Sequence, residues 1–538
     1  MAARQPRIVT VPPAHPAREI ALLKSAPPLP SPDAPAATRP EPGVSAGFAR
    51  LMEDFRSRLE REIAAFLAAK RAAAGSAATG PGGPANRPAW IALGKPPDDL
   101  PHDPITDPAH DLTHELPDDL IDGLGRMMSQ GGKRLRPALV YYTYRACGGR
   151  ADGQVLPLAL AVEFLHTYLL VHDDIMDHAE VRRGQPAAHV RFRDLHRAGR
   201  LRGDADDFGR SAAILLGDLA HTYAVELFTS VAVRNGGADP LGTGHPQPRP
   251  VPAPPARDWV ELNRCFSRMC EEVIAGQYLE YLLAHRRHAG RQASGPSAAA
   301  TEAPASLPAA LAHAPRESDL LRVLRLKSGR YTAERPIQLG ALLAGAPADL
   351  RAELSRYGTA VGEAFQLQDD LLGMFGDPKT VGKPVGDDLR EGKYTLLIHH
   401  ALVNGGAADR QRVADALGDP HLGDAAVAQV QEALERTGAR RAVTAMIAER
   451  LAEARHALGK LQALAPLAPM APLAPMASLA PMAPVAPTAP PAALTQRAPA
   501  VPTPGGAAAG PEHPGSSEIA EGLRFLAGLL DYLWERER

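Results

Sequence analysis

The chain has 538 residues, and its 53 prolines and 48 glycines exclude regular helix or strand over much of that length. Its formal net charge of −2 gives no overall field that favours nucleic acid or an anionic membrane, so no nucleic-acid partner is expected. The three cysteines, Cys147, Cys265 and Cys270, form neither a disulfide framework nor a metal-ligand spacing, which fits a reducing, cytoplasmic location.

Residues 1–45 are rich in proline, alanine and charge, and they are predicted to form a disordered tail. A helix is predicted over 48–74, and helical spacing without strand-like alternation runs from residue 119 onward. No run of about 18 uncharged apolar residues without proline occurs, so no stable membrane insertion is expected. The proline- and glycine-rich interruptions are predicted to be flexible inserts, near 75–112, 236–257, 287–315 and 464–515.

The final segment, 516–538, is amphipathic and begins with two candidate capping residues, Ser516 and Ser517. It is predicted to be one last core helix that returns to the bundle after the insert. Length alone suggests about three domains. The distribution of helical segments instead predicts a single all-α domain over 46–538, interrupted by the inserts.

The stretch "HTYLLVHDDIMDHAEVRRGQ" begins at His166 and places three carboxylates at the end of an apolar helix. Helical spacing puts Asp173 and Asp177 on one face with His166 and Glu163, and Asp174 beside that face. Carboxylates this close repel each other unless a cation bridges them. Oxygen ligands without cysteine suit Mg²⁺. The alternative is a solvated helix end that carries acidic residues.

A second stretch, "GEAFQLQDDLLGMFGD", repeats this pattern, with Gln366, Asp369 and Asp370 on one helical face after apolar residues. Two acidic helix ends that face each other across a cavity would hold a diphosphate from both sides through metal ions. Basic side chains suited to phosphate oxygens accompany them, at Lys133, Arg136, Arg182, Arg183, Lys327, Lys383 and Lys393. Taken singly, each basic residue is equally explained as ordinary surface charge.

The chain resembles the polyprenyl synthetase family, the trans-isoprenyl diphosphate synthases, and within it the geranylgeranyl-producing type. The resemblance is carried by motifs that follow one another in the family's order over about 131–395: "GGKRLRP", "EFLHTYLLVHDDIMDHAEVRRGQPAAH", "GQYLEYL", "LKSGRYTAERP", "AFQLQDDLLGMFGD" and "GKPVGDDLREGK". The terminal "LLDYLWERER" resembles the family's closing helix. The resemblance implies the isoprenoid synthase fold, a single bundle of antiparallel helices around a central cavity. A homodimer is also expected.

The resemblance also implies roles for individual residues. Metal binding is assigned to Asp173, Asp177 and Asp369, and catalysis to these three with Asp174, Asp370 and Lys327. Isopentenyl diphosphate is expected to contact Lys133, Arg136, His166 and Arg183. The allylic diphosphate is expected to contact Arg182, Lys327, Ser328, Gln366 and Lys383, and Lys393 is a further substrate-binding residue.

Four positions depart from the usual family pattern. Gly373 stands where many members have the last aspartate of the second motif, so that helix lacks one possible metal ligand. Ser328 and Ala188 replace common threonines, and Glu280 replaces a common aspartate.

The expected reaction joins substrates that are anionic at one end and hydrocarbon at the other. Mg²⁺ and the basic residues would neutralise the allylic diphosphate as it leaves. The double bond of isopentenyl diphosphate would then attack the allylic cation, and a proton would be lost to the departing diphosphate. Competing interpretations are a terpene cyclase, a non-catalytic subunit of a heteromeric synthase, and an interaction protein that uses its proline-rich segments.

Product length is predicted from Tyr168 and Leu169, which precede the first acidic motif. A side chain five residues before Asp173 lies about 7.5 Å deeper along the helix. In the family, a bulky residue at this place commonly stops elongation, so the resemblance implies a C20 product, with C15 as the alternative and a longer chain also open. Helix geometry alone leaves open whether Tyr168 faces the cavity or packs against a neighbouring helix.

Overall fold

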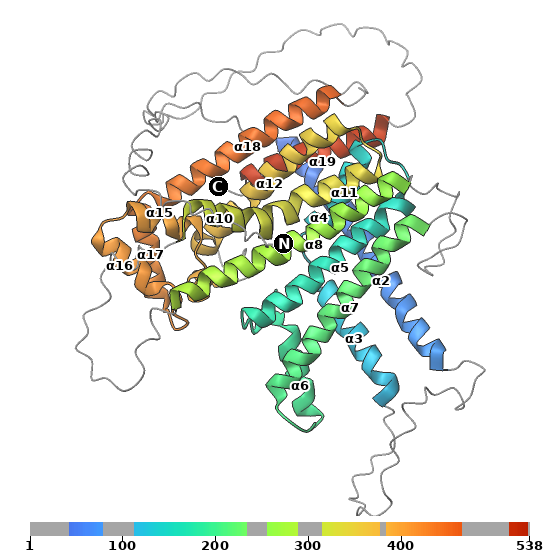
Figure 1. Cartoon of the computed structure of the whole chain (residues 1–538), viewed down its shortest axis with the longest axis horizontal. Coiled ribbons are helices and arrows are strands. Elements are labelled where there is room, and N and C mark those ends of the chain that lie inside the picture. Colours follow the sequence, from blue (N-terminus) through green and yellow to red (C-terminus); the bar gives the residue numbers. More distant parts are fainter. Residues whose placement is uncertain are drawn as a thin grey trace, which may run out of the picture. The chain divides into compact units, whose positions relative to one another are not determined.

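The computed structural model describes residues 42–78, 112–233, 256–288, 315–376, 384–464 and 516–535. These residues are almost entirely helical, which confirms the all-α prediction (Figure 1). In chain order the helices are α2 (Pro42–Ala78), α3 (Leu112–Ser129), α4 (Leu135–Ala146), α5 (Asp152–Met176), α6 (Ala188–Ala198), α7 (Ala205–Val233), α8 (Ala256–His288), α10 (Glu317–Val323), the π-helix η3 (Leu324–Glu334), α11 (Arg335–Leu343), α12 (Ala348–Phe375), α14 (Asp387–Arg390), α15 (Leu396–Asn404), α16 (Ala407–Ala416), α17 (Asp424–Arg436), α18 (Ala439–Leu464) and α19 (Ser516–Glu535).

The predicted tail and inserts fall mostly outside the described residues. The tail was expected to extend to residue 45, but α2 already begins at Pro42. The inserts predicted near 75–112, 236–257, 287–315 and 464–515 overlap the described residues only at their ends, where helices extend a few residues into them. The predicted helix over 48–74 is confirmed and is longer at both ends.

Helix α5 lies in the core of the bundle, and its side chains over 155–165 are all buried. All of them except Glu163 are apolar, and a helix that is apolar on every side is expected to be covered on every side. It packs against α4 and α7. Among the described helices, α5 is the one long and apolar enough to cross a membrane, but 72% of its apolar window is buried inside the protein. Helix α5 is therefore best described as a core helix of the bundle.

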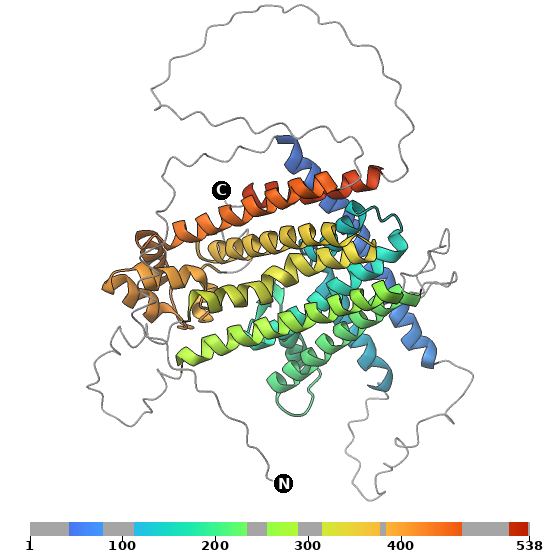
Figure 2. The same cartoon turned by 45° about the horizontal axis from the view of Figure 1, so that its top comes forward.

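Helices α18, α12, η3 and α8 lie side by side in that order (Figure 2). Glycine makes two of these contacts possible. A Cβ atom at Gly362 would lie 2.1 Å from the carbonyl oxygen of Gly329, and a Cβ at Gly276 would lie 2.4 Å from the backbone nitrogen of Lys327. Any larger residue would push the helices apart, so the η3 backbone is held closely between α12 and α8 next to Lys327 and Ser328.

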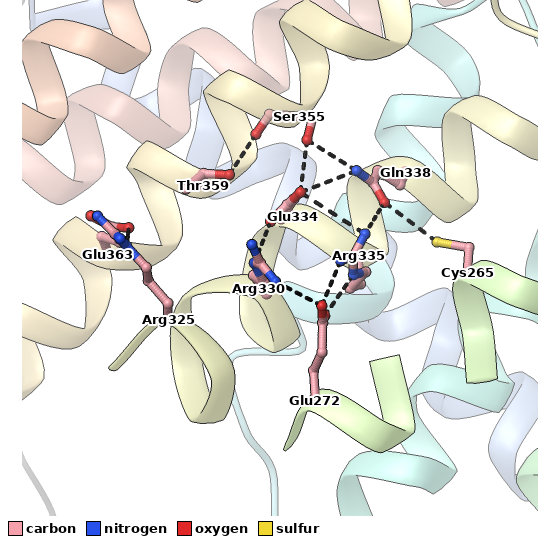
Figure 3. Close-up of polar contacts among 10 residues, drawn as sticks. All are labelled: Cys265, Glu272, Arg325, Arg330, Glu334, Arg335, Gln338, Ser355, Thr359 and Glu363. Atoms are coloured by element: carbon pink, nitrogen blue, oxygen red, sulfur yellow. Dashed lines mark hydrogen bonds and ion pairs between the residues drawn. The ribbon is translucent and has the colours of Figure 1, made fainter. Parts of the chain in front are cut away.

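Ion pairs hold η3 from both sides as well (Figure 3). On α8, Glu272 accepts hydrogen bonds from Arg330 Nη1 at 2.8 Å and from Arg335 Nη2 at 2.7 Å. On α12, Glu363 accepts one from Arg325 Nε at 2.6 Å. A π-helix of 11 residues is unusual, because π geometry mostly occurs as single turns, frequently at functional sites. These contacts therefore hold this π-helical segment in one position.

The last helix returns to the bundle, as predicted. In α19, Phe525 stacks on Tyr142 of α4 with ring centroids 4.2 Å apart. Tyr357 of α12 donates a hydrogen bond of 2.6 Å to the carbonyl oxygen of Leu526. Both contacts are fully or largely buried, so α19 completes the core although the predicted insert separates it from α18 in the sequence.

Candidate active site

A cavity of about 930 Å³ opens among the helices, and its wall combines charged and apolar side chains. The elements that supply this wall are α4, α5, α8, α10, η3, α12, α14, α15, α19 and the strand β1 (Val181–Arg182). The predicted site residues that line it are Lys133, Arg136, His166, Arg182, Arg183, Lys327, Ser328, Gln366, Asp369, Asp370 and Lys393. Residues more than 200 positions apart in the sequence therefore face one space.

The first acidic motif lies at the carboxyl end of α5, beside this cavity. Asp173 Oδ1 accepts a hydrogen bond of 3.1 Å from Gln277 of α8 and lies 3.9 Å from Lys327 Nζ. Asp177, the residue that ends α5, lies 3.4 Å from Lys393 Nζ. These contacts join the motif to lysines that line the cavity, which agrees with the prediction that both aspartates belong to one site.

Asp174 differs from its two neighbours because its side chain is fully buried and turns toward Arg182. Arg182 Nε donates to Asp174 Oδ1 at 2.7 Å, and its Nη2 contacts the same oxygen. Burial raises the pKa of Asp174, and the arginine opposes this shift. A carboxylate paired in this way holds Arg182 in place, so Asp174 acts through the arginine.

The arginine pair sits on a small hairpin of β1 and β2 (Gln185–Pro186). Its two turn residues, Arg183 and Gly184, both have positive φ values, 52° and 74°, as the tight two-residue turn of a hairpin requires. Arg182 consequently points to the acidic motif, whereas Arg183 Nη1 contacts the carbonyl oxygen of Gly131 in the "GGKRLRP" loop. The hairpin thus places Arg182 at the first acidic motif and Arg183 at the loop that carries Lys133.

The second acidic motif lies near the end of α12. Gln366 Nε2 donates a hydrogen bond of 2.8 Å to Asp370 Oδ1, one helical turn away. Burial raises the pKa of Asp370 well above its ordinary value, and the nearby carboxylate of Asp388 adds to the shift. Asp369 and Asp370 both line the cavity, together with Asp388. The predicted motif is therefore part of the same wall.

Lys327, on η3, is placed between carboxylates of two other helices. Its ammonium contacts Glu280 of α8 and lies 3.9 Å from Asp173 of α5. Burial alone lowers the pKa of this lysine, but the two carboxylates outweigh burial and raise it. The side chain is consequently a fixed positive charge at the edge of the first acidic motif.

Lys393 joins the two acidic regions. Its Nζ lies 3.4 Å from Asp177 Oδ2 and 3.8 Å from Asp388 Oδ1, and it also contacts Glu391. Burial lowers its pKa, but Asp388 and Asp177 together raise it well above the ordinary value. One partly buried lysine therefore bridges a carboxylate from the first motif and a carboxylate from the segment that follows the second.

A basic region forms another part of the cavity wall. Arg136 Nη1 is 3.3 Å from His166 Nε2, and its Nη2 donates to Thr332 at 2.8 Å. Tyr331 holds the other ring nitrogen of His166 at 3.2 Å. Burial lowers the pKa of His166, and Arg136 and the neighbouring arginines lower it further. Lys133 places its ammonium 5.5 Å from the Phe365 ring centroid. This region suits a second anionic group.

Several supporting residues were not predicted. Arg134 forms a buried ion pair with Glu163 and contacts the carbonyl oxygen of Met128, which fixes the loop that carries Lys133. Arg134 adopts a left-handed backbone conformation with a φ of 49°. No pattern in the sequence predicts this conformation at that position. Tyr331 and Thr332 stand in the quoted "LKSGRYTAERP" motif but were given no role. The one feature of the sequence that could have indicated a role for them is that they follow Lys327 closely in the same motif.

Six predicted residues are not part of the cavity wall: Asp173, Asp174 and Asp177, which lie beside it, and Lys383, Tyr168 and Leu169. Lys383 lies outside the described residues. Tyr168 and Leu169 are partly buried against the core and are absent from the cavity wall within the described ranges. The Tyr168 ring lies 4.7 Å from the His172 ring and 5.1 Å from the His221 ring of α7. Its side chain therefore stands between α5 and α7.

The chemistry of the ligands determines which metal fits. Within the described ranges, no three or more His, Cys, Asp or Glu side chains converge as a ready-made metal site. Mg²⁺ needs no such cage, because it keeps several waters and binds through one or two carboxylates together with substrate phosphates. The oxygen atoms of Asp173, Asp177 and Asp369 fit that mode, whereas Asp174 is fully buried and its Oδ1 is occupied by Arg182.

Comparisons with known proteins agree with this geometry. Residues 119–436 match the sequence model of the polyprenyl synthetase family. The short chain isoprenyl diphosphate synthase of Methanocaldococcus jannaschii is 29% identical over 309 residues, which cover 57% of this chain and 73% of that protein. The geranylfarnesyl diphosphate synthase of Aeropyrum pernix is 32% identical over 296 residues, which cover 54% and 72%. A crystal structure of geranylgeranyl pyrophosphate synthase from Corynebacterium glutamicum, complexed with isoprenyl diphosphate and magnesium, matches with a TM-score of 0.56 and 26% identity, over 77% of this chain and 98% of that one. The chain belongs to the polyprenyl synthetase family.

Proposed function

We propose that this protein is a Mg²⁺-dependent, cytoplasmic, homodimeric synthase that makes all-trans geranylgeranyl diphosphate. By its family the chain is a prenyl diphosphate synthase, an enzyme that joins isopentenyl diphosphate to an allylic diphosphate. The metal, the product length, the oligomeric state and the location are the proposed additions. The alternative products are farnesyl diphosphate and a longer chain.

One observation carries the proposal. The carboxylates of α5 and those that follow α12 are joined through Lys393, and a separate basic region around Arg136 and His166 shares the same cavity. The site thus offers two places for anionic groups, and only one of them is rich in carboxylates. Two diphosphates, one held through a cation and one held directly by arginine and lysine, match that division.

The allylic diphosphate would bind at the carboxylate-rich part. Mg²⁺ held by Asp173, Asp177 and Asp369 would supply the charge that stabilises the diphosphate as it leaves. Lys327 and Lys393 are fixed by their carboxylate partners and lie beside that group, so they add positive charge without rearrangement.

Isopentenyl diphosphate would bind at the basic region, through Lys133, Arg136 and Arg183. Burial and then the neighbouring arginines lower the pKa of His166, so at neutral pH it would contribute a hydrogen bond and no charge. Holding both substrates in one cavity makes the bond-forming step effectively unimolecular. The allylic C–O bond breaks, the double bond of isopentenyl diphosphate attacks the carbon, and the departing diphosphate takes the proton that is lost. Apolar wall residues such as Leu324 and Leu396 keep water from the cation.

The C20 product is proposed because a growing chain that follows α5 away from Asp173 would meet Tyr168. The ring stands between α5 and α7, on the part of α5 that precedes Asp173. The competing interpretation remains a ring that only packs against His221. The Tyr168→Ala experiment below separates the two.

The homodimer is supported by apolar side chains that α7 exposes. Ile214 is 43% exposed and Leu215 is 58% exposed, and a second copy would cover them. The expected mass in sedimentation analysis is twice that of the chain, and Leu215→Asp should shift it toward the monomer. The cytoplasmic location is supported by the unpaired cysteines.

The function is tested by incubating the protein with Mg²⁺, isopentenyl diphosphate and allylic diphosphates of increasing length. We expect condensation from each starter shorter than C20 and accumulation of the C20 diphosphate. Chain-length analysis of the dephosphorylated products measures this. A C15 or longer end product would correct the length alone, whereas no product from any starter would favour the non-catalytic subunit.

A further inference from the structure

The two acidic helix ends are not equivalent in sequence. At the end of α5 the carboxylates stand at positions i, i+1 and i+4, which are Asp173, Asp174 and Asp177. Near the end of α12 the first two positions are again aspartates, Asp369 and Asp370, but the i+4 position is Gly373. A glycine cannot supply a carboxylate, so α12 by itself offers one ligand fewer.

Another segment places a carboxylate at that position. A Cβ atom built on Gly373 would lie 2.8 Å from Asp388 Oδ2. The carboxylate of Asp388, a residue of α14, therefore occupies the space that a side chain at position 373 would need. A glycine at 373 is what allows this approach.

The backbone fixes this arrangement. Gly386 donates a backbone hydrogen bond of 3.0 Å to the carbonyl oxygen of Gly373, which ties the start of α14 directly to α12. Gly386 has a φ of 76°, in the left-handed region that glycine adopts readily, and it turns the chain so that α14 begins at the next residue. Asp388 therefore reaches Gly373 from a segment that is anchored beside it.

The Asp388 side chain also faces the site. It lines the cavity with Asp369 and Asp370, and it is 24% exposed. Its Oδ1 lies 3.8 Å from Lys393, whose ammonium also lies 3.4 Å from Asp177. Asp177 at the end of α5 and Asp388 near the end of α12 therefore both contact the same lysine, Lys393.

We propose that Asp388 supplies, from α14, the third carboxylate of the second acidic cluster, and that it binds the divalent cation held there together with Asp369. This inference rests on the proposed function and assigns a metal-binding role to a residue outside both aspartate motifs. The competing role is purely electrostatic, in which Asp388 only orients Lys393.

The first test measures metal binding without turnover. Mn²⁺ serves as a paramagnetic probe, and the free ion is followed by electron paramagnetic resonance, with and without inorganic diphosphate. We expect Asp388→Asn to weaken Mn²⁺ binding about tenfold or more, which is the size of effect seen when groups around a metal are removed. The matched control is Asp387→Asn on the same helix, which should have a clearly smaller effect. An equal or larger effect of Asp387→Asn would overturn the assignment.

The second test moves the carboxylate from α14 to α12. Gly373→Asp alone should not improve Mn²⁺ binding, because the new side chain meets Asp388. The double variant Gly373→Asp/Asp388→Gly should bind Mn²⁺ close to the wild-type value and better than Asp388→Gly. If the double variant binds as weakly as Asp388→Gly, the position of the carboxylate is not what the metal requires, and the proposal fails. Thermal unfolding of each variant shows that it is folded.

The outcomes distinguish this proposal from the proposed function. If Asp388→Asn keeps wild-type Mn²⁺ affinity but weakens inorganic diphosphate binding, Asp388 acts only through Lys393, and the metal role is wrong while the synthase function stands. If the wild-type protein binds Mn²⁺ as expected but forms no prenyl product, the proposed function fails while the metal assignment survives.

Discussion

The two acidic helix ends are built from similar residues but are neutralised differently. At the end of α5, the protein supplies basic partners: Arg182 pairs with Asp174, and Lys393 lies 3.4 Å from Asp177. Near the end of α12, Asp370 accepts a hydrogen bond from the neutral amide of Gln366 and lies close to another carboxylate, Asp388.

This difference indicates how charge is shared across the site. At α5 one carboxylate has become a structural partner for an arginine, and its removal should affect folding. At α12 the pKa of Asp370 is raised by burial and by Asp388, so negative charge there is unfavourable until a cation arrives. The first end is therefore partly structural, and the second depends more on a ligand.

The largest expected effect is a difference in folding stability between variants of the two acidic helix ends. Asp174→Ala leaves the partly buried Arg182 with only Asp173, 3.5 Å away, as a carboxylate partner and should lower the free energy of unfolding by about 3 kcal/mol. Asp370→Asn keeps the shape, can still interact with Gln366, and should change that free energy by about 1 kcal/mol or less. Denaturant unfolding of both variants measures the difference. Equal destabilisation would contradict the structural role assigned to Asp174.

The next effect concerns turnover, where the two ends should behave alike. Asp173→Ala and Asp369→Ala should each lower kcat about 100- to 1000-fold, the range found when a group that stabilises transition-state charge is removed. Steady-state condensation at saturating Mg²⁺ measures this, and circular dichroism confirms the fold. Near-normal turnover in either variant, or in wild-type protein with the metal chelated, would refute the mechanism.

A smaller effect follows from His166, seven residues before Asp173 on α5. Burial and the neighbouring arginines lower its pKa in the folded protein. Below about pH 6.5 the unfolded chain therefore binds a proton that the folded chain does not, so stability falls as pH falls, by at most about 1.4 kcal/mol per pH unit. This loss ends at the folded pKa. His166→Asn should remove this part of the slope when unfolding is followed between pH 7.5 and 5 in otherwise identical buffers. Identical slopes would show that folding does not lower the pKa of His166.

The smallest effect on turnover is expected at Tyr168. Tyr168→Ala should lengthen the products while most of the turnover remains, because the ring is not among the side chains of the cavity wall that holds the diphosphates. Leu169→Ala is the neighbouring control, with a weaker shift expected. Product distributions are compared by chromatography from one starter. An unchanged distribution with lower thermal stability would show that Tyr168 only packs against α7.

The sequence by itself determined the fold class, the two acidic motifs and most of the basic residues. Periodicity of apolar residues is local information, so α5, α12 and the returning α19 were predictable from spacing. The residues on each acidic helix end also follow from local spacing, because positions three and four apart share a face.

Only the tertiary structure decided which residues from different elements meet. The ion pair of Arg134 with Glu163, the turn of Arg182 toward Asp174 and the bridge of Lys393 between Asp177 and Asp388 join residues 5 to 216 positions apart. The approach of Asp388 to Gly373 depends on a backbone hydrogen bond and a left-handed glycine that no periodicity encodes. Sequence spacing fixes neighbours along one helix, whereas contacts between helices depend on how all of them pack, and the extra ligand we propose at the second acidic end arises from that packing.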